Sequence, residues 1–476
     1  MNLLTFLLAL ALPTLLGWVL LLILEKNHPV LGRTERMFWA LILGPTLFTL
    51  IVFLSQVLGL TKLNLFGFLI PLLLVLSLLL FVAQRTHALQ VRHAKIFYAQ
   101  SAPLSRFLVC LILLLSVWAG MKVLAGTYDL ISVPTSWDDS FNNWNMRGKM
   151  FFFHQKLVLE IPIGNGLVQP SDGVSSYPPS VPLLKTWLSV LRGSWQEPLI
   201  NGLHIIWLVG LIGSFYFALR RRLSPLLSLG GVCLLISLPL FLIQAMNPYA
   251  DIFLAAHLFL AMMCVYRSAQ AQELPELSTW MKLSGFAIGI LLFTKNEASV
   301  LYAPLLLFLL IFIMLSKKKN NSIDAESVRK LLGTSFLIVA CIGAPWILFK
   351  WFHGLSFGNA KSVSGMHIAF HPAVPGAIWY HLSHEPNWLL LPFVLPLTLL
   401  LSGKRAFRLP EGVLTVFLFA AITAQFLIFT FTPLATEAIM QTGLSRGLLH
   451  IAPIAMLLVM VLAESLLNGK HRECYC

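Results

Sequence analysis

Long apolar stretches separated by short polar loops dominate this chain of 476 residues. A stretch of about 20 apolar residues is long enough to cross the hydrocarbon core of a bilayer, which is about 30 Å thick. The pattern predicts about thirteen transmembrane helices. Their expected ranges are 3–24, 38–60, 64–83, 107–126, 199–219, 226–245, 252–267, 281–294, 298–315, 331–351, 387–402, 412–432 and 448–467. The first stretch is expected to be a retained anchor, because no small-residue cleavage site follows it.

The composition agrees with this pattern. Hydrophobic residues make up 58% of the chain, charged residues make up 11%, and the mean hydropathy is +0.83. So much apolar surface excludes the water-soluble globular class. We therefore expect an all-α polytopic membrane protein without a soluble domain, in which all chemistry takes place in the loops and at the helix ends.

The net charge of +14 comes from basic residues that are spread over alternate loops. Basic loops stay on the cytoplasmic side of a membrane, so the chain is expected to have its N-terminus outside and its C-terminus inside. This distribution does not indicate a nucleic-acid partner. With that orientation, nearly every unusual polar motif falls on the outer face, in loops 127–198, 246–251, 353–386 and 433–447.

Three parts are expected along the chain. Residues 1–106 form an N-terminal addition of three spans, residues 107–467 form the main helical core, and residues 468–476 form a cytoplasmic tail. Loop 127–198 is too long for a simple connection. It is predicted to hold an amphipathic helix that starts near Ser136 and lies flat at the interface, and a second interfacial helix over 183–191.

Two adjacent carboxylates, Asp138 and Asp139, follow Trp137 in this loop. Neighbouring residues of a helix point about 100° apart, so the two carboxylates do not face one site. In one interpretation, one carboxylate caps the helix and the other is solvated. In the other, the neighbour of the cap is a general base or a metal ligand, because the pKa of a carboxylate at a membrane edge can be raised towards neutrality. The residues alone favour neither interpretation.

Other polar groups interrupt apolar stretches on the expected outer face. Residues 294–297 form either a turn between spans or a phosphate site in which Glu297 orients Lys295. Asp251 begins a span, where a carboxylate stabilises a helix N-terminus. Arg446 is unusual on an outer loop, which favours an anionic partner for it.

The outer loop 353–386 is rich in histidine. His381, His384 and Glu385 have a spacing that suits one helix face. They are candidate metal ligands, but their spacing matches no zinc signature. We therefore expect interfacial histidines without a metal ion.

In their order along the chain, these motifs resemble those of bacterial C-type (GT-C) membrane glycosyltransferases, the superfamily of protein O-mannosyltransferases and aminoarabinose transferases. An aspartate followed by Trp-Asn-Met-Arg-Gly-Lys at 144–149 opens the first outer loop, and a Tyr-Pro-x-x-x-Pro turn follows at 177–182. Tyr-Ala-Asp at 249–251, Lys-Asn-Glu at 295–297, and Arg446 ahead of Pro453 complete the series. The resemblance covers residues 107–467 and implies a GT-C-like helical bundle.

The resemblance implies transfer of a sugar from a polyprenyl-phosphate donor to a lipid, glycan or protein acceptor, at the outer face of a bacterial inner (plasma) membrane. It implies that Asp139 is the catalytic base or the carboxylate that positions the acceptor, with Asp138 as the fallback because the tandem pair departs from the usual single aspartate. Lys295 and Arg446 are then candidates for the donor phosphate. The further candidates for the substrate site are Trp144, Arg147, Tyr177, Asp251, Glu297 and His384.

Inverting attack by an acceptor hydroxyl needs one base and cations on the leaving phosphate. No cofactor is expected, and no metal, although dependence on a divalent metal varies among such enzymes. The sequence contains no Gly-x-x-x-x-Gly-Lys loop for a nucleotide. A transporter or flippase of lipid-linked glycans is the main alternative, but it would place charges near the bilayer centre. An O-antigen-ligase-like enzyme, which would use the histidines of loop 353–386, is another.

Overall fold

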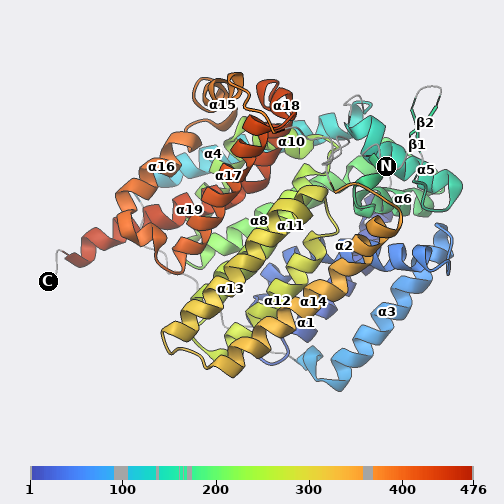
Figure 1. Ribbon diagram of the computed structural model, residues 1–476, viewed down its shortest axis with the longest axis horizontal. Helices are drawn as coiled ribbons and strands as arrows, with labels where there is room; N and C mark the ends of the chain where they lie inside the picture. Colours follow the sequence, from blue (N-terminus) through green and yellow to red (C-terminus); the bar gives the residue numbers. More distant parts are fainter. Residues whose placement is uncertain are drawn as a thin grey trace.

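The computed structural model describes residues 3–90, 105–135, 139–159, 161–163, 166–168, 174–357 and 368–473. Helices dominate it (Figure 1). Within these residues, ten helices are long and apolar enough to cross a membrane. They are α1 (Leu3–Leu24), α2 (Arg33–Val57), α3 (Leu65–Arg85), α4 (Arg106–Ser132), α7–α8 (Glu197–Asn201 and Leu203–Arg220), α11 (Asp251–Gln270), η5–α13 (Ala298–Tyr302 and Ala303–Lys319), α14 (Ala325–Phe352), α17 (Glu411–Phe431) and α19 (Gly443–Glu473).

Each apolar stretch that was predicted to span the membrane is helical, but some of these helices are broken, too short or not apolar enough to cross it. The stretch 226–245 is divided into α9 (Pro225–Ser237) and α10 (Pro239–Met246), which meet at 75° and form either a broken eleventh span or a re-entrant loop. Pro239 explains the break, because it has no N–H and its ring clashes with the preceding turn. α16 (Leu391–Ser402) has 12 residues, or about 18 Å of helix, which is too short to cross. α12 (Leu274–Leu291) is not apolar enough.

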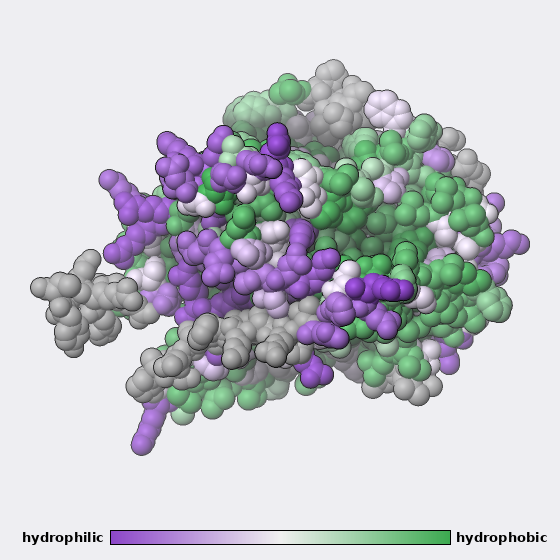
Figure 2. Space-filling model, turned by 90° about the horizontal axis from the view of Figure 1, so that it is seen from below, coloured by the Kyte–Doolittle hydropathy of each residue, from purple (hydrophilic) through white to green (hydrophobic). Residues whose placement is uncertain are grey.

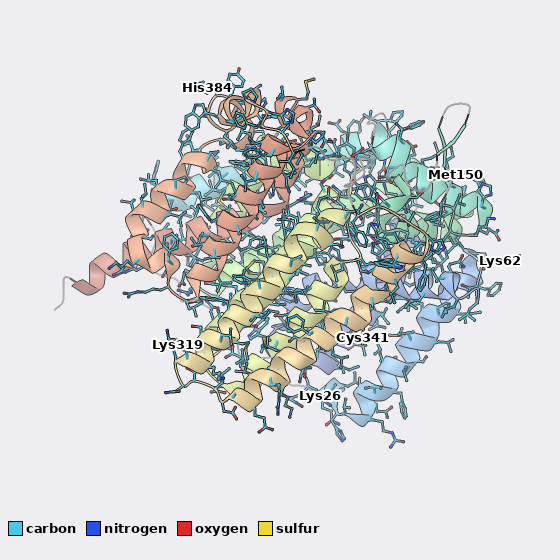
Figure 3. All side chains as sticks on the ribbon, viewed as in Figure 1. Lys26, Lys62, Met150, Lys319, Cys341 and His384 are labelled. Atoms are coloured by element: carbon cyan, nitrogen blue, oxygen red, sulfur yellow. The ribbon has the colours of Figure 1, made fainter. Side chains whose placement is uncertain are left out.

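The smaller elements gather at one end of the bundle (Figure 1). They include α5 (Met146–His154), α6 (Ser180–Arg192), α15 (Ala373–Ser383), α18 (Ala435–Ile439) and an antiparallel hairpin of β1 (Ile161–Ile163) and β2 (Gly166–Val168). Met150 and His384 lie at this end, whereas Lys26 and Lys319 lie at the opposite end (Figure 3). The described part of the long loop around Met150 and the basic loop at Lys319 are therefore at opposite ends.

Both helices that were predicted for loop 127–198 are present. The first runs through the π-helical residues Ser140–Asn145 into α5, and the second is α6. Residues 136–138, which include Asp138, lie outside the described residues. The β-hairpin between the two helices was not predicted. The remaining short 3₁₀ turns are Ala88–Gln90, Val174–Ser176, Pro386–Trp388 and Gly403–Phe407.

α11 is the central helix of the bundle. It is buried along its whole span and contacts α2, α8, α12, α13, α17 and α19. Small residues such as Ala255, Ala256 and Ala261 let these neighbours approach closely. Because protein surrounds α11 on all sides, the polar residue at its start, Asp251, meets side chains rather than lipid.

The N-terminal helices are packed into this bundle. α1 and α2 cross so closely that a Cβ on Gly17 would lie 2.7 Å from the Cα of Gly44. Pro13 cannot donate to the carbonyl of Ala9 one turn earlier, and the indole Nε1 of Trp187 in α6 donates to that carbonyl instead, at 2.8 Å. α1 is thereby bonded to the outer loop.

Candidate functional site

Asp251 is the centre of a buried polar cluster. As the first residue of α11, its Oδ1 accepts from the Nζ of Lys295 at 2.8 Å and from the Nε2 of His450 at 2.8 Å. The three side chains are almost completely buried. They come from α11, from the loop after α12 and from α19, so the cluster depends on the tertiary fold.

A hydrogen-bonded chain fixes the ring of His450. Because the Asp251 carboxylate accepts from Nε2, the opposite nitrogen, Nδ1, is left to accept from the hydroxyl of Tyr302 at 3.1 Å. The Nε2 of Gln425 donates to that hydroxyl at 3.3 Å. A neutral imidazole satisfies both contacts, so His450 needs no positive charge to hold Asp251.

Lys295 bridges two carboxylates, those of Asp251 and of Glu297, the latter at 3.0 Å. Burial lowers the pKa of Lys295, but the two carboxylates outweigh burial and hold this pKa above its ordinary value. Burial raises the pKa of Glu297, but the charge of Lys295 outweighs it and keeps this pKa below its ordinary value. Lys295 and Glu297 are therefore both charged near neutral pH, and the positive charge of Lys295 is already shared between two carboxylates.

Asp139 and Arg446 form a second ion pair beside this cluster. Nη1 of Arg446 donates to Oδ2 of Asp139, and the guanidinium lies over the ring of Tyr249, with its carbon 5.6 Å from the centroid. Asp139 is thus an anionic partner of the kind that was expected for Arg446. The side chain of Asp139 is 40% exposed, against 0% for Asp251, so of these two carboxylates Asp139 is the one open to a substrate.

One face of α19 brings the two pairs together. Arg446 and His450 are four residues apart, so they lie one above the other on the same side of the helix. Arg446 holds Asp139 and His450 holds Asp251. Residues that are distant in sequence therefore form one site at the start of α19.

Trp144, Arg147 and Tyr177 form the wall next to these ion pairs. Nη2 of Arg147 donates to the carbonyl of Tyr177 at 3.0 Å, and the rings of Trp144 and Tyr177 meet edge to face at 5.4 Å. Burial lowers the pKa of Arg147 to about 9. Burial, and then the carboxylate of Glu297, raise the pKa of Tyr177. Arg147 therefore holds the Tyr-Pro turn and makes no described ion pair with the carboxylates.

A network that the sequence analysis missed holds the segment around Asp139. Nδ2 of Asn145 donates to Thr135 Oγ1 at 3.1 Å and to Asn201 Oδ1 at 3.3 Å, and Asn201 Nδ2 donates to the same threonine at 3.1 Å. The buried Nζ of Lys185 donates to Oδ1 of Asn145. The two residues that flank the Asp139 segment, Thr135 and Asn145, are thus held by one amide, that of Asn201.

A second missed residue is Lys350 in the last turn of α14. Its Nζ donates to the carbonyl of Ser176 and to Oδ1 of Asn296, each at 2.7 Å. This contact joins the loop before α6 to the Lys-Asn-Glu segment. A lysine at the end of an apolar stretch was the sequence signal that could have revealed it.

In the described part of the structure, no contact joins His384 to this site. Its ring stacks on Tyr380 at 5.4 Å, and its Nδ1 is 2.7 Å from Ser383 Oγ. The neighbouring His381 pairs with Glu385 at 2.9 Å. Among the described residues, no three His, Cys, Asp or Glu side chains are grouped so that they could hold a metal ion.

A cavity of about 670 Å³ opens beside the network around Asp139. Thr135 and Asn201 form part of its wall, with Asp129 of α4 and Asn247 after α10. The rest of its lining is mainly apolar and comes from α4 and α10. The site therefore combines an accessible carboxylate, cations and an adjacent apolar space, which suits a charged substrate with a lipid chain.

No family model matches the sequence, and no curated protein matches it. Among solved structures, the chain is similar to ArnT from Cupriavidus metallidurans bound to undecaprenyl phosphate, with a TM-score of 0.51 and 15% identity over 77% of this chain and 64% of ArnT. For ArnT in the apo state the TM-score is 0.48, with 17% identity over 74% and 59%. The chain thus spans less than two thirds of ArnT. ArnT is an aminoarabinose transferase with the GT-C fold. The chain accordingly has the GT-C-like polytopic membrane fold that the order of its motifs predicted.

Proposed function

We propose that the protein is a membrane glycosyltransferase that transfers a sugar from a polyprenyl-phosphate carrier to a lipid, glycan or protein acceptor. The observation that carries the proposal is the ion pair of the accessible Asp139 with Arg446, next to the buried Asp251 cluster. The fold supports it, because the similar ArnT structure contains undecaprenyl phosphate, a lipid of the proposed donor class.

Arg446 is the proposed partner of the donor phosphate. It already binds one oxyanion, Asp139, and a phosphate oxygen can replace that carboxylate. Lys295 is the second cation, and its interactions with Asp251 and Glu297 make its contribution smaller than that of Arg446. Trp144 and Tyr177 are buried and pack edge to face, so they shape the wall of the site rather than stack on the sugar.

Asp139 is the proposed base. The acceptor hydroxyl oxygen attacks the anomeric carbon while the bond from that carbon to the phosphate oxygen breaks. Asp139 takes the hydroxyl proton, and polyprenyl phosphate leaves with the bonding electron pair. Attack from the face opposite the leaving group inverts the anomeric centre. We expect this transfer to proceed without a metal or a cofactor.

The proposed place of the reaction is the outer face of a bacterial inner membrane. Basic loops such as 317–319 lie at the end of the bundle opposite the site, and the side with basic loops is normally the cytoplasmic one. His384 has no proposed role in the transfer step, because its described contacts lie within α15 and just after it.

The test uses a strain that lacks the native gene and is complemented with the wild type, Asp139→Asn or Asp324→Asn at matched expression. Asp324 caps α14 through a bond to the Ser327 N–H, and asparagine caps equally well, so this variant is the control. Envelope lipids, glycans and glycoproteins are profiled by mass spectrometry.

We expect one sugar to be missing in the null strain and in Asp139→Asn, with a polyprenyl-phosphate sugar accumulating, and to return with Asp324→Asn. A wild-type profile in Asp139→Asn would show that this carboxylate is not the base. Accumulation of a complete lipid-linked glycan in the null strain, without loss of a transfer step, would favour the transporter.

A further inference from the structure

A short corner joins α18 to α19 just before Arg446. Gln441 lies in this corner with a φ of +58°, in the left-handed region. Its N–H donates to the carbonyl of Ala438 at 3.2 Å, and the N–H of Thr442 donates to the carbonyl of Glu437 at 3.0 Å. These two bonds form a Schellman motif, which ends a helix at a left-handed residue. The position where α19 begins therefore depends on Gln441.

Glutamine is an unusual residue for this position. Glycine is common there because it adopts a positive φ without strain, whereas a Cβ makes the same conformation unfavourable. The Nε2 of Gln441 donates to Oε2 of Glu385, and its Oε1 accepts from Nδ2 of Asn387 at 2.9 Å. The same nitrogen of Asn387 donates to Oε2 of Glu385 at 2.6 Å. The three side chains thus form a closed ring, and its bonds offset the backbone strain.

His381 of α15 joins this ring to the end of α18. Its Nδ1 is 2.9 Å from Oε1 of Glu385, and its Nε2 is 3.0 Å from the carbonyl oxygen of Ile439. Both partners can only accept hydrogen bonds, so the imidazolium form satisfies them together. The four side chains of His381, Glu385, Asn387 and Gln441 are called the corner clamp below. The clamp holds the corner on both sides, at the last residue of α18 and at the turn itself.

Apolar packing around the corner is limited. Among the described residues, the corner lies beside a small hydrophobic cluster that is distinct from the main core and joins α15, α17, α18 and the first turn of α19. Its buried members are Val374, Ile378, Phe429, Ala435, Ala438 and Leu444. Hydrophobic contacts are non-directional, so a cluster of this size does not by itself fix the direction in which α19 begins. The directional bonds of the corner clamp supply that constraint.

Arg446 lies in the first turn of α19, so its position follows that of the corner. The hydroxyl of Ser445 donates to the carbonyl of Thr442 at 3.1 Å, which bonds this turn to the corner. The guanidinium of Arg446 has to meet Asp139 and, under the proposed function, the donor phosphate. A misplacement of about 1 Å can weaken such an interaction up to about 100-fold.

We propose that Glu385 and Gln441 are positioning residues that hold the start of α19, and through it Arg446, where the guanidinium meets the donor phosphate. The inference rests on the proposed function, because that function assigns the phosphate to Arg446. Both residues act through Arg446 and not on the reacting atoms. Donor affinity therefore depends on a loop carboxylate whose described bonds all go to the clamp.

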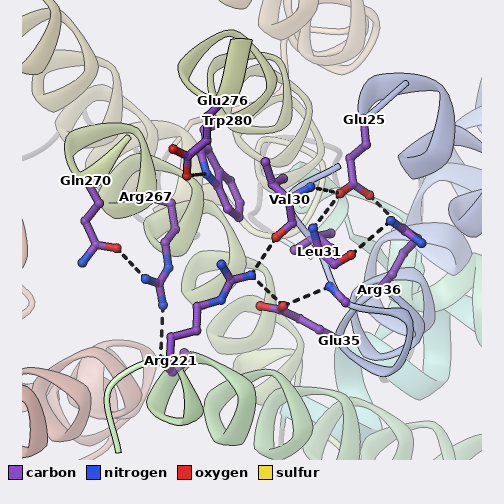
Figure 4. Close-up of polar contacts among 12 residues, drawn as sticks. Glu25, Val30, Leu31, Glu35, Arg36, Arg221, Arg267, Gln270, Glu276 and Trp280 are labelled. Atoms are coloured by element: carbon purple, nitrogen blue, oxygen red, sulfur yellow. Dashed lines mark hydrogen bonds and ion pairs between the residues drawn. The ribbon is translucent and has the colours of Figure 1, made fainter. Parts of the chain in front are cut away.

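The opposite end of the bundle supplies a control for loss of stability. Glu35, in the first turn of α2, accepts from Arg221 at 2.7 Å within a network of ion pairs that ties α2 to α8 (Figure 4). This network lies on the Lys26 side of the molecule, which is the side seen in Figure 2, where hydrophilic side chains gather over part of the surface. Both partners are largely buried. Glu35→Gln should therefore lower the thermal unfolding midpoint without moving Arg446.

The test is equilibrium binding of undecaprenyl phosphate to the purified full chain, with the thermal unfolding midpoint of each variant. Glu385→Ala should weaken binding about tenfold, a smaller loss than in Arg446→Ala, because the guanidinium is still present. Gln441→Gly should weaken binding to a similar extent with little change in midpoint, because relief of the strain offsets the lost hydrogen bonds. The double variant should lose no more than either single variant, because both act through one clamp. Glu35→Gln should keep the wild-type affinity.

Hydrogen exchange measures the corner without reference to the donor. The amides of Gln441 and Thr442 should exchange faster in Glu385→Ala than in the wild type, because the clamp no longer holds the turn. Wild-type exchange of both amides would overturn the proposal. If Glu385→Ala does not fold, Gln441→Gly still tests the effect on donor binding.

The remaining outcomes separate this inference from the proposed function. Wild-type affinity in Glu385→Ala and Gln441→Gly, beside a loss in Arg446→Ala, would overturn the inference and leave the proposed function standing. Wild-type affinity in Arg446→Ala would overturn the donor role of Arg446, and the inference with it. A loss of affinity in Glu35→Gln equal to that in the clamp variants would show that lower stability alone weakens binding, which would overturn the positioning role.

Discussion

Asp251 and Asp139, two carboxylates of the candidate site, have opposite surroundings, although one face of α19 holds both. Asp251 is fully buried and receives hydrogen bonds from Lys295 and His450, whereas Asp139 is 40% exposed and pairs with Arg446. A buried, paired carboxylate stabilises its surroundings, and an accessible one can meet a substrate. We therefore expect different consequences when each is removed.

Asp251→Ala should destabilise the fold by about 3–5 kcal/mol, the usual cost of removing one partner of a buried ion pair. It leaves the nearly buried Lys295 with Glu297 alone. Thermal unfolding of the purified protein in detergent measures the loss. Asp139→Asn is the control. It should keep the wild-type midpoint, because Asp139 is half-exposed and its ion pair contributes little to stability. A wild-type midpoint in Asp251→Ala would disprove the structural role.

Arg446→Ala should weaken binding of undecaprenyl phosphate about 10- to 100-fold, because a hydrogen bond to a charged group contributes about 1.5–3 kcal/mol. Equilibrium binding to the purified protein measures this change. Arg192→Ala removes a basic residue from α6 at the same end of the bundle and serves as the control. Unchanged affinity in Arg446→Ala would remove this residue from the donor site.

At the scale of elements, the segment that carries Asp139 is held from both sides. Asn201, at the end of α7, binds Thr135 before the segment and Asn145 after it, and Lys185 of α6 binds Asn145. Two short helices, α6 and α7, therefore set the position of a residue that neither contains. Because Lys185 is buried in this network, the stability of the network should depend on pH.

The stability that depends on Lys185 should rise with pH. Burial lowers the pKa of Lys185 to about 7, whereas lysine in an unfolded chain has a pKa of about 10.4. Between these values the unfolded chain binds a proton that the folded chain does not. The wild type should therefore gain roughly 1.4 kcal/mol per pH unit above pH 7, relative to Lys185→Met. Below pH 7 the difference should be constant.

Thermal unfolding of the wild type, Lys185→Met and Lys149→Met between pH 6 and about 9 checks this expectation. Lys149 is an exposed lysine on the neighbouring α5, so its variant should follow the wild type at every pH. Parallel curves for all three proteins would show that Lys185 is already protonated in the folded state.

The bond from Trp187 to Ala9 joins two elements that are far apart in sequence. Trp187→Phe should cost about 1–3 kcal/mol, because it leaves the carbonyl of Ala9 without a donor in a buried place. Pro13→Ala in the same chain restores an N–H one turn after Ala9, and should recover part of the lost thermal stability. A double variant that is no more stable than Trp187→Phe would contradict this account.

At the scale of the whole molecule, local patterns in the sequence predicted the helices and the order of the motifs. Apolar stretches form helices because a membrane leaves the backbone no other partner, so hydropathy located every long helix. The break at Pro239, the short α16 and the insufficient hydropathy of α12 reduce the number of spans among the described residues to ten or eleven, against about thirteen predicted from hydropathy.

Pairings between distant residues could not be predicted in the same way. Arg446 was expected to have an anionic partner, but its pairing with Asp139 depends on how α19 packs. Lys295 was expected to face a phosphate, and in the fold it lies between two carboxylates. Lys185 and Lys350 receive their partners only from the tertiary structure. The position of Lys350 at the end of an apolar stretch marks it as unusual but does not identify its partners.

The ion pair of Asp139 with Arg446 has a consequence for the order in which substrates bind. A carboxylate that is neutralised by a guanidinium is a weak base towards water or an acceptor hydroxyl. Only an arriving phosphate competes for Arg446, so only the donor would release Asp139 for proton transfer. Under the proposed function, the enzyme binds its donor first, and an acceptor that binds before the donor does not react. Steady-state kinetics should then show compulsory order, with the acceptor unable to bind productively to the empty enzyme.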